Sequence, residues 1–487
     1  MRGPRPLGVV IKLGTSSIVD EKTHEPLLSI LTSIVETAVK LRKDGHKVII
    51  VSSGAIGVGL RRMDVDKRPK HLSKLQALAA IGQCRLMSLW DSLFTHLNQP
   101  IAQILLTRND IADRSRYLNA QRTVNELLDM GVIPIVNEND TLAVSEIKFG
   151  DNDTLSAITA AMVHADLLFL MTDVDCLYDK NPRTHPDAHP IEVVDDIGSL
   201  VADVSSAGSS LGTGGMSTKI VAARLATSAG VTTVITRSSI PGNIVKIVKH
   251  IQASRSPPSL ATKANQQSSS STPGSPDYHP HNHHGHHQTI ESALSPTSSR
   301  APTPFQEPTP KIPLHTRFLP SPHPVRDRYF WILHGLRPHG TLYIDQGAYK
   351  ALVGKAGLLP VGVVAVEGSF AQQEAVRLCV VDRRRFHPSS PAGGDEEGEE
   401  GGRLWEGEAQ EVGRALTNYS SAEIARIKGR QSAEVEGILG YADSEYVAQR
   451  ESISFFAGVR ESRPVTPARE AVEGRGIGGY EGEGAVL

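Results

Sequence analysis

Short apolar runs alternate with longer segments of helical periodicity over the first half of the chain. The runs are rich in Val, Ile and Leu, as strands covered on both faces are, and span residues 7–13, 47–51, 101–106, 132–136, 167–171 and 232–236. Apolar residues spaced three and four apart predict helices over 27–44, 72–97, 115–130, 154–163 and 217–229. Gly45, Gly131 and Gly230 stand where glycines commonly end helices. Residues 1–251 are therefore predicted to form an α/β domain with a largely parallel sheet.

The pattern changes in the second half of the chain. Residues 252–326 are rich in Ser, Pro, Thr, Gln and His, which predicts a disordered linker whose histidines are solvated rather than metal-bound. Short β-like runs punctuated by Gly and Pro then predict a small β-rich domain over 327–460. An acidic, Gly-rich insert near 386–412 is predicted to be a surface loop, and residues 461–487 to be a flexible tail.

Charge and composition argue against a strongly basic protein, a disulfide-rich protein, a zinc module and a membrane-spanning protein. The 487 residues include 51 Lys and Arg against 53 Asp and Glu, so the formal charge of -2 provides no global basic field and any anion site must be local. The three cysteines lie far apart without metal-ligand spacing, which favours neither a disulfide framework nor a zinc module. An apolar stretch of about 18 residues is missing, so we expect no membrane span and a soluble, cytoplasmic protein.

Polar segments follow four of the predicted strands. They are KLGTSS (12–17), SSGAIG (52–57), NEND (137–140) and TDVD (172–175). In open α/β sheets a ligand lies beyond the carboxyl ends of the strands, so these groups are expected to meet at one edge.

Two glycine-containing segments of the first domain carry a lysine, one of them KLGTSS and the other a segment further along the chain. Lys12 precedes Gly14 and two hydroxyl residues, and Lys219 ends the segment GTGGMSTK (212–219) just before a predicted helix. Each could be an ordinary tight turn, and neither matches the GxxxxGK[ST] or GxGxxG pattern. Two such turns in one α/β domain favour a phosphate site.

The segment from Asn137 to Ala157 is dense in Asp, Asn and Glu. It could be only a solvated turn, but these groups suit an amino-acid substrate, whose ammonium group needs oxygen acceptors. Lysines dominate the polar loops, and phosphoryl transfer depends mainly on positioning and charge neutralisation. The residues alone therefore lead to a nucleotide-dependent kinase.

Several motifs together resemble one family. IKLGTSS, VSSGAIGVG, PIVNEND, IKFGDNDTLSA, LLFLMTDVDCLYDKNPR and GTGGMSTK closely resemble the glutamate 5-kinases of the amino acid kinase family, over residues 7–251. GTLYIDQGAYKAL, in the second domain, resembles the PUA domain that many microbial members carry. The resemblance implies a three-layer αβα sandwich around a mostly parallel sheet, followed by a small PUA-like domain.

The implied activity is ATP-dependent phosphorylation of the γ-carboxylate of L-glutamate to L-glutamyl 5-phosphate, the first step of proline biosynthesis. Mg²⁺ would bind through the nucleotide, with no protein ligand assigned. Proline would inhibit the enzyme by competing near the loop from Asp140 to Asp153.

The resemblance also implies roles for individual residues. Lys12 and Lys219 would stabilise the transferring phosphoryl group, and the catalytic Asp153 would orient both lysines. Ser53, Asp140 and Asn152 would bind glutamate. The implied ATP-binding residues are Lys12, Gly14, Thr172, Asp173, Thr213, Gly214, Gly215, Met216, Ser217, Thr218 and Lys219.

The expected partners are other copies of the chain, in a homo-oligomer, and a glutamate-5-semialdehyde dehydrogenase that would receive the labile acyl phosphate. One alternative is a related kinase acting on carbamate, acetylglutamate, uridylate or aspartate, although IKLGTSS and VNEND favour glutamate. Another is an RNA-binding PUA protein with a vestigial kinase domain. Lys12, Asp153 and Lys219 are all present, and the acidic insert suits phosphate contacts poorly, so the kinase is favoured.

Overall fold

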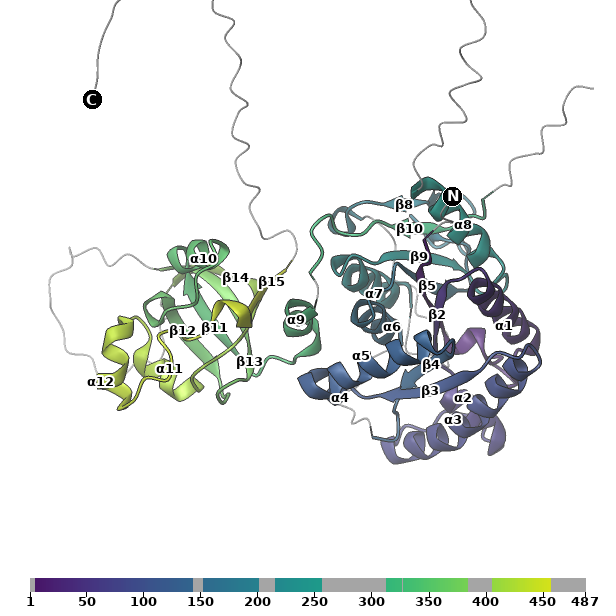
Figure 1. Ribbon diagram of the computed structural model, residues 1–487, viewed down its shortest axis with the longest axis horizontal. Coiled ribbons are helices and arrows are strands. Elements are labelled where there is room, and N and C mark those ends of the chain that lie inside the picture. The colour runs from purple at the N-terminus through teal and green to yellow at the C-terminus, as the bar shows by residue number, and fades with distance from the viewer. Residues whose placement is uncertain are drawn as a thin grey trace, which may run out of the picture. The chain divides into compact units, whose positions relative to one another are not determined.

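The computed structural model describes residues 5–142, 152–200, 215–255, 312–325, 327–383 and 405–456. The chain divides into two compact units, Met1–Phe330 and Trp331–Leu487 (Figure 1). Each unit has its own sheet and its own buried apolar cluster.

The first unit is built around an eight-stranded sheet in the order β3-β4-β2-β1-β5-β9-β10-β8. The strands from β3 to β9 in that order pair in parallel, whereas β10 runs antiparallel to β9 and parallel to β8. Each of the six predicted runs forms one strand, which confirms the mostly parallel sheet. The strands are β1 (Gly8–Leu13), β2 (Lys47–Ser52), β3 (Ile101–Leu106), β4 (Ile133–Glu138), β5 (Leu167–Thr172), β8 (Val193–Val194), β9 (Thr232–Arg237) and β10 (Thr316–Phe318). Strands β6 (Leu177–Tyr178) and β7 (Pro190–Ile191) form a separate hairpin.

Helices cover both faces of this sheet, as the three-layer sandwich requires (Figure 1). One layer contains α1 (Leu28–Lys43), α3 (Leu72–Thr95) and α8 (Asn243–Arg255), and the other α5 (Arg114–Asp129), α6 (Asn152–Met162) and α7 (Met216–Ser228). Short helices α2 (Ala55–Arg62) and α4 (Arg108–Ala112) precede α3 and α5. The predicted helix-ending glycines have left-handed backbones, with φ of 90° at Gly45, 85° at Gly131 and 87° at Gly230.

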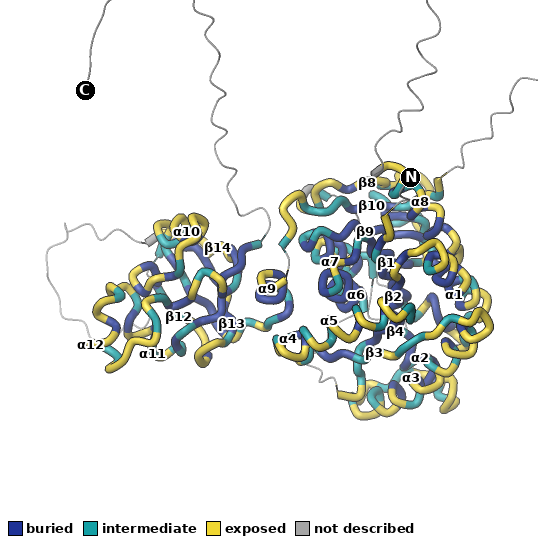
Figure 2. Tube along the Cα trace, viewed as in Figure 1, coloured by how far each residue is buried: buried dark blue, intermediate teal, exposed yellow. Residues whose placement is uncertain are grey.

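The alternation of side chains along β1 determines where Lys12 points. Val9, Ile11 and Leu13 are buried in the apolar cluster formed with α1, α3 and α8. Because successive side chains of a strand point to opposite faces, Lys12 lies on the face covered by α6, which packs against β1. Figure 2 shows the central strands of the sheet buried and the outer surfaces of the helices exposed.

Two predicted boundaries need correction. The range 252–326 is not linker throughout, because α8 continues to Arg255 and β10 joins the sheet. The Thr316 hydroxyl donates to the Ile191 carbonyl at 2.6 Å and accepts from the Leu177 amide at 2.7 Å, so long-range pairing holds a strand too short to show a periodic pattern. The acidic insert, predicted over 386–412, overlaps β14 from Trp405 onward, because strand pairing extends into the acidic sequence. The His-rich part of the predicted linker, the rest of the insert and the predicted tail lie outside the described residues.

The second unit contains a five-stranded sheet in the order β12-β11-β13-β14-β15, which confirms the predicted β-rich domain. Its strands are β11 (Gly340–Asp345), β12 (Val363–Gly368), β13 (Ala375–Arg383), β14 (Trp405–Leu416) and β15 (Ile453–Phe455). Its helices are α10 (Gln346–Val353), α11 (Ser421–Ile427) and α12 (Val435–Leu439), and it begins with a π-helical turn, Trp331–Gly335. Helix α9 (Asp327–Phe330) is the last element of the first unit. The motif GTLYIDQGAYKAL forms β11 and α10, and Asp345 caps α10 by accepting from the Ala348 amide at 2.7 Å.

Helix α2 was not predicted, because its two glycines favour a loop when the sequence is considered alone. In the structure, glycines allow α2 and α3 to approach closely. A Cβ at Gly82 would lie 1.7 Å from the Ala55 carbonyl oxygen, and one at Gly59 would lie 2.1 Å from the Leu78 carbonyl oxygen. The backbones are thus in direct contact.

Gly82→Ala is predicted to destabilise the first unit by about 1–3 kcal/mol or more, because the added methyl group must push two helix backbones apart. Gly242→Ala is the matched control, since its Cβ would meet nothing within 4 Å. Thermal unfolding of the full chain compares the two variants, and equal midpoints would contradict the close packing of α2 and α3.

Candidate active site

The predicted polar segments meet at one edge of the first sheet. Strands β1, β2, β4, β5 and β9 are parallel, so their carboxyl ends lie on the same side. Lys12 is the penultimate residue of β1, Ser53 follows β2, Asn137 is near the end of β4 and Thr172 ends β5. The edge therefore carries a cation, amide groups and hydroxyls.

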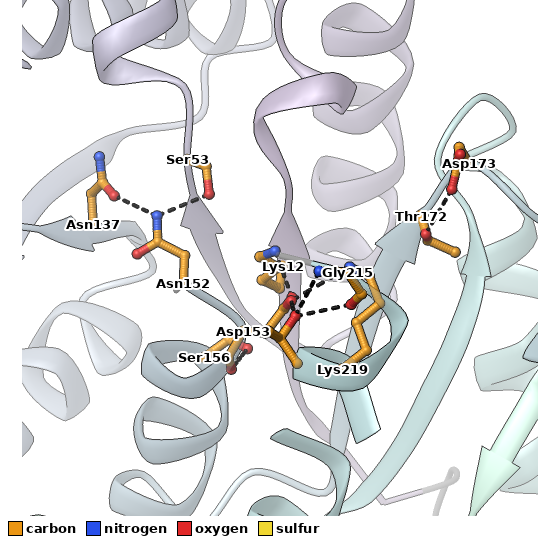
Figure 3. Close-up of polar contacts among 11 residues, drawn as sticks. Lys12, Ser53, Asn137, Asn152, Asp153, Ser156, Thr172, Asp173, Gly215 and Lys219 are labelled. Carbon is orange, nitrogen blue, oxygen red and sulfur yellow. Dashed lines mark hydrogen bonds and ion pairs between the residues drawn. The ribbon is translucent and has the colours of Figure 1, made fainter. Parts of the chain in front are cut away.

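Two lysines share one buried carboxylate at this edge (Figure 3). Lys12 Nζ lies 2.5 Å from Asp153 Oδ1, and Lys219 Nζ lies 3.4 Å from Asp153 Oδ2. Lys12 is 4% exposed, Lys219 7% and Asp153 0%. The lysines come from β1 and α7 and the aspartate from α6, so the contacts of α6 with β1 and with α7 bring the three together.

Groups at the starts of α6 and α7 hold Asp153 in place. Asp153 lies in the first turn of α6, where the helix dipole favours negative charge. Thr218 Oγ1 lies 2.8 Å from Asp153 Oδ2 as donor, and it accepts from the Gly215 amide at 3.1 Å. Asp153 is thereby tied to the N-terminus of α7 as well as to both lysines.

Opposing effects act on the pKa of Asp153. Burial raises the pKa, but the ammonium groups of Lys12 and Lys219 and the hydrogen bonds from Lys12 and Thr218 outweigh burial and lower the pKa to about 2. Asp153 is therefore ionised at neutral pH and forms ion pairs with both lysines.

Amide side chains form a second cluster next to the charged one. Asn152 Nδ2 donates to Ser53 Oγ at 2.9 Å and to Asn137 Oδ1 at 3.0 Å (Figure 3). Asn137 Nδ2 donates to Gln83 Oε1 at 2.8 Å. Because Asn152 and Asp153 are adjacent, the first turn of α6 belongs to both clusters.

One ion pair lies within the stretch after β5, and a second joins that stretch to the end of β9. Thr172 Oγ1 donates to Asp173 Oδ1 at 3.0 Å, and Asp173 also pairs with Arg183. Arg237 makes two hydrogen bonds of 2.7 Å to the carboxylate of Asp175. These contacts order the stretch that carries two of the predicted ATP-binding residues.

The structure brings many of the predicted site residues together, although not all in one contact network. Lys12, Asp153, Lys219, Thr218 and Gly215 form the charged cluster. Gly14 lies beside it, since a Cβ there would be 3.7 Å from Lys12 Nζ. Ser53 and Asn152 belong to the amide cluster, and Asp140 lies half-buried in the turn after β4. Thr172 and Asp173 lie at the end of β5, and Met216 and Ser217 begin α7. Thr213 and Gly214 lie outside the described residues.

Two members of the amide cluster, Gln83 and Asn137, were not predicted as site residues. Asn137 belongs to the NEND segment, so its position at a strand end was the available signal. Gln83 lies inside a long helix, and the sequence gives no signal for it.

This arrangement suits an anion with spread negative charge. The two lysines and one aspartate have a net charge of +1, and the glycine-led start of α7 adds the backbone N–H groups of a helix N-terminus. Those groups fit the phosphates of a nucleotide. Among the described residues, no group of three or more His, Cys, Asp or Glu side chains could hold a metal ion. None of the described helices is long and apolar enough to cross a membrane.

Asp153→Asn is predicted to destabilise the fold by about 3–5 kcal/mol, because it leaves two buried ammonium groups without a counter-charge. Changing Lys12 and Lys219 to Met in the same chain should recover most of that loss. Chemical denaturation of the single and triple variants measures both effects. An Asp153→Asn protein as stable as the wild type would contradict the proposed electrostatic role.

The stability that Asp153 contributes should depend on pH. Its folded pKa of about 2 is below the ordinary 3.8, so this contribution is complete above about pH 4 and is lost as the pH falls toward 2. The stability difference between wild type and Asp153→Asn should shrink by about 2 kcal/mol over that range. Subtracting the pH dependence of the variant's unfolding free energy from that of the wild type cancels the contribution of the other carboxyl groups. A difference that stays constant between about pH 4 and pH 2 would contradict the lowered pKa of Asp153.

Comparison with known proteins agrees with the fold. The profile of the amino acid kinase family matches residues 8–237, and that of the PUA domain matches residues 340–439. The chain is 50% identical over 446 residues to a probable glutamate 5-kinase of Schizosaccharomyces pombe, covering 91% of this chain and 92% of that protein. It is 43% identical to glutamate 5-kinases of Cyanothece sp. and Nostoc sp., over 91% of this chain and 98% and 96% of theirs. The chain therefore belongs to the glutamate 5-kinase branch of the amino acid kinase family and carries a C-terminal PUA domain.

Proposed function

We propose that this protein transfers the γ-phosphoryl group of ATP to the γ-carboxylate of L-glutamate, giving L-glutamyl 5-phosphate and ADP. The observation that carries the proposal is the pair of buried lysines held by Asp153 at the carboxyl edge of the sheet. The names of the relatives support glutamate as the acceptor.

The two lysines neutralise charge during transfer. Lys12 from β1 and Lys219 from α7 approach Asp153 from different elements, so a phosphoryl group lying over them meets positive charge from two directions. Asp153 fixes both ammonium groups before the substrates arrive, and a preorganised site need not rearrange during the reaction. A carboxylate nucleophile is already deprotonated at neutral pH, so the reaction needs no general base.

The other predicted residues are assigned by their positions around this centre. The start of α7, with Gly215, Met216, Ser217 and Thr218, would bind the nucleotide phosphates together with the preceding Thr213 and Gly214. Gly14, Thr172 and Asp173 complete the proposed nucleotide site. We assign Mg²⁺ to the nucleotide phosphates, where it would add positive charge, without a protein ligand.

Glutamate would lie between the charged and the amide clusters. Its γ-carboxylate would face Lys12, and its α-amino end would face Ser53, Asn152 and Asp140. A bound ammonium group needs oxygen acceptors, and all three side chains supply them.

Regulation and partners extend the same proposal. Proline, which has an α-carboxylate and a cationic amine, would compete for the amino-acid end of the glutamate site. The acyl phosphate product hydrolyses readily, so we propose that it is passed directly to a glutamate-5-semialdehyde dehydrogenase. We further propose a homo-oligomer in the cytoplasm, with the kinase unit and the PUA unit as separate domains.

Lys219→Met is predicted to lower the rate of phosphoryl transfer by about 100- to 1,000-fold, because a preorganised charge is lost from the transition state. The assay contains ATP, Mg²⁺ and L-glutamate, with hydroxylamine to trap the acyl phosphate as γ-glutamyl hydroxamate. Lys246→Met is the matched control, since Lys246 is exposed on α8. Proline should suppress hydroxamate formation by the wild type and raise the apparent KM for glutamate.

Failure of folded wild-type protein to form hydroxamate would refute the proposed reaction. Faster turnover with aspartate or UMP would mean that the protein is a kinase of the same family that phosphorylates a different substrate. Salt-dependent retention of inactive protein on tRNA would instead favour the RNA-binding alternative.

A further inference from the structure

Three amide side chains form a continuous hydrogen-bonded row beside the charged cluster. Gln83, in the middle of α3, accepts through Oε1 from Asn137 Nδ2 at 2.8 Å. Asn137, 2% exposed, accepts through Oδ1 from Asn152 Nδ2 at 3.0 Å. The row thus joins α3, β4 and α6.

The main chain determines the direction of this row. An amide group has an oxygen that only accepts and a nitrogen that only donates. The backbone N–H of Glu138 donates to Asn137 Oδ1 at 2.9 Å, and a backbone N–H cannot accept. The oxygen of Asn137 is therefore held on that side, and its nitrogen must face Gln83.

The direction of the row then decides which end of Asn152 is used internally. Asn152 must present Nδ2 to Asn137, and the same nitrogen lies 2.9 Å from Ser53 Oγ. The side-chain oxygen of Asn152, Oδ1, takes part in neither of these hydrogen bonds. This oxygen is buried and has no hydrogen-bond donor among the described residues. A buried carbonyl oxygen without a donor is unfavourable, so a ligand that brings an N–H group would be stabilised there.

Gln83 is fixed by the tight packing of its helix. The preceding residue, Gly82, lies against the Ala55 carbonyl oxygen so closely that a Cβ would be 1.7 Å away. Ala55 begins α2, two residues after Ser53. The contact between Gly82 and Ala55 therefore fixes the main chain beside Gln83 and also near Ser53, which lies at the opposite end of the row.

We propose that Gln83 is a positioning residue that, together with the Glu138 backbone N–H, holds the row in the orientation that makes the site prefer an acceptor with an α-ammonium group. Gln83 holds the nitrogen of Asn137, the oxygen of Asn137 holds the nitrogen of Asn152, and the oxygen of Asn152 is presented to the ammonium group. Gln83 itself does not touch the substrate. This inference rests on the proposed glutamate kinase activity and identifies what selects the amino-acid end of the acceptor.

Variants of Gln83 test the proposal in the full chain. Gln83→Met removes the acceptor without adding charge, whereas Gln83→Glu keeps an oxygen acceptor for Asn137 Nδ2. Arg85→Met changes an exposed side chain on the same helix and controls for disturbance of α3. The measured quantities are the KM for glutamate, the KM for ATP, kcat and the inhibition constant of glutarate, which is glutamate without its amino group.

Gln83→Met should raise the KM for glutamate about fivefold or more, the effect of losing one hydrogen bond. The inhibition constant of glutarate, the KM for ATP and kcat should change much less. Gln83→Glu should retain most of the preference for glutamate over glutarate, and Arg85→Met should match the wild type.

Three outcomes would overturn the proposal. Equal weakening of glutamate and glutarate binding would mean that Gln83 only supports the fold. Unchanged kinetics in Gln83→Met would mean that the row does not need this acceptor. Absence of γ-glutamyl hydroxamate with wild-type protein would refute the kinase proposal and this inference with it, whereas an active wild type with an unchanged preference in Gln83→Met would refute the inference alone.

Discussion

A single buried carboxylate between two ammonium groups is the constraint on which the rest of the site depends. Burying one charge in a protein is expensive, and Asp153, Lys12 and Lys219 are all buried. Each ion is tolerated because an opposite charge lies within 3.4 Å or less. The contact also joins β1, α6 and α7, so the electrostatic requirement helps to determine how these elements pack. In the proposed reaction, the excess of one positive charge would attract the phosphoryl group.

The first turn of α6 links charge to recognition. Asp153 belongs to the charged cluster, while the adjacent Asn152 belongs to the row of amides that reaches Gln83. In the proposed reaction, an acceptor bound across this turn would have its reacting carboxylate at the lysines and its amino group at the amides. Phosphoryl transfer and acceptor selection would therefore share one helix start. This also explains why a change in α3, remote in sequence, is expected to affect substrate preference.

Local patterns predicted the parts of the molecule that depend on local physics. The runs of Val, Ile and Leu became strands, and the glycines at 45, 131 and 230 ended helices, because burial and left-handed backbone geometry have clear signatures. Lys12 and Lys219 were singled out because each belongs to a glycine-containing segment, Lys12 at the start of KLGTSS and Lys219 at the end of GTGGMSTK. Helix α2 and strand β10 were not predicted, since one depends on close contact with α3 and the other on pairing with β9 and β8. Gln83 could not be found from sequence, because its meaning comes only from the orientation of Asn137.

The central claim is that Asp153 is a fixed anion which orients two cations and takes no proton. The most direct test is the single-turnover rate of acyl phosphate formation in H₂O and in D₂O, with a viscosity-matched H₂O control. The account predicts equal rates in D₂O and in the control, because no proton moves in the chemical step. A slower rate in D₂O than in the viscosity-matched control would show proton transfer in that step and would contradict it.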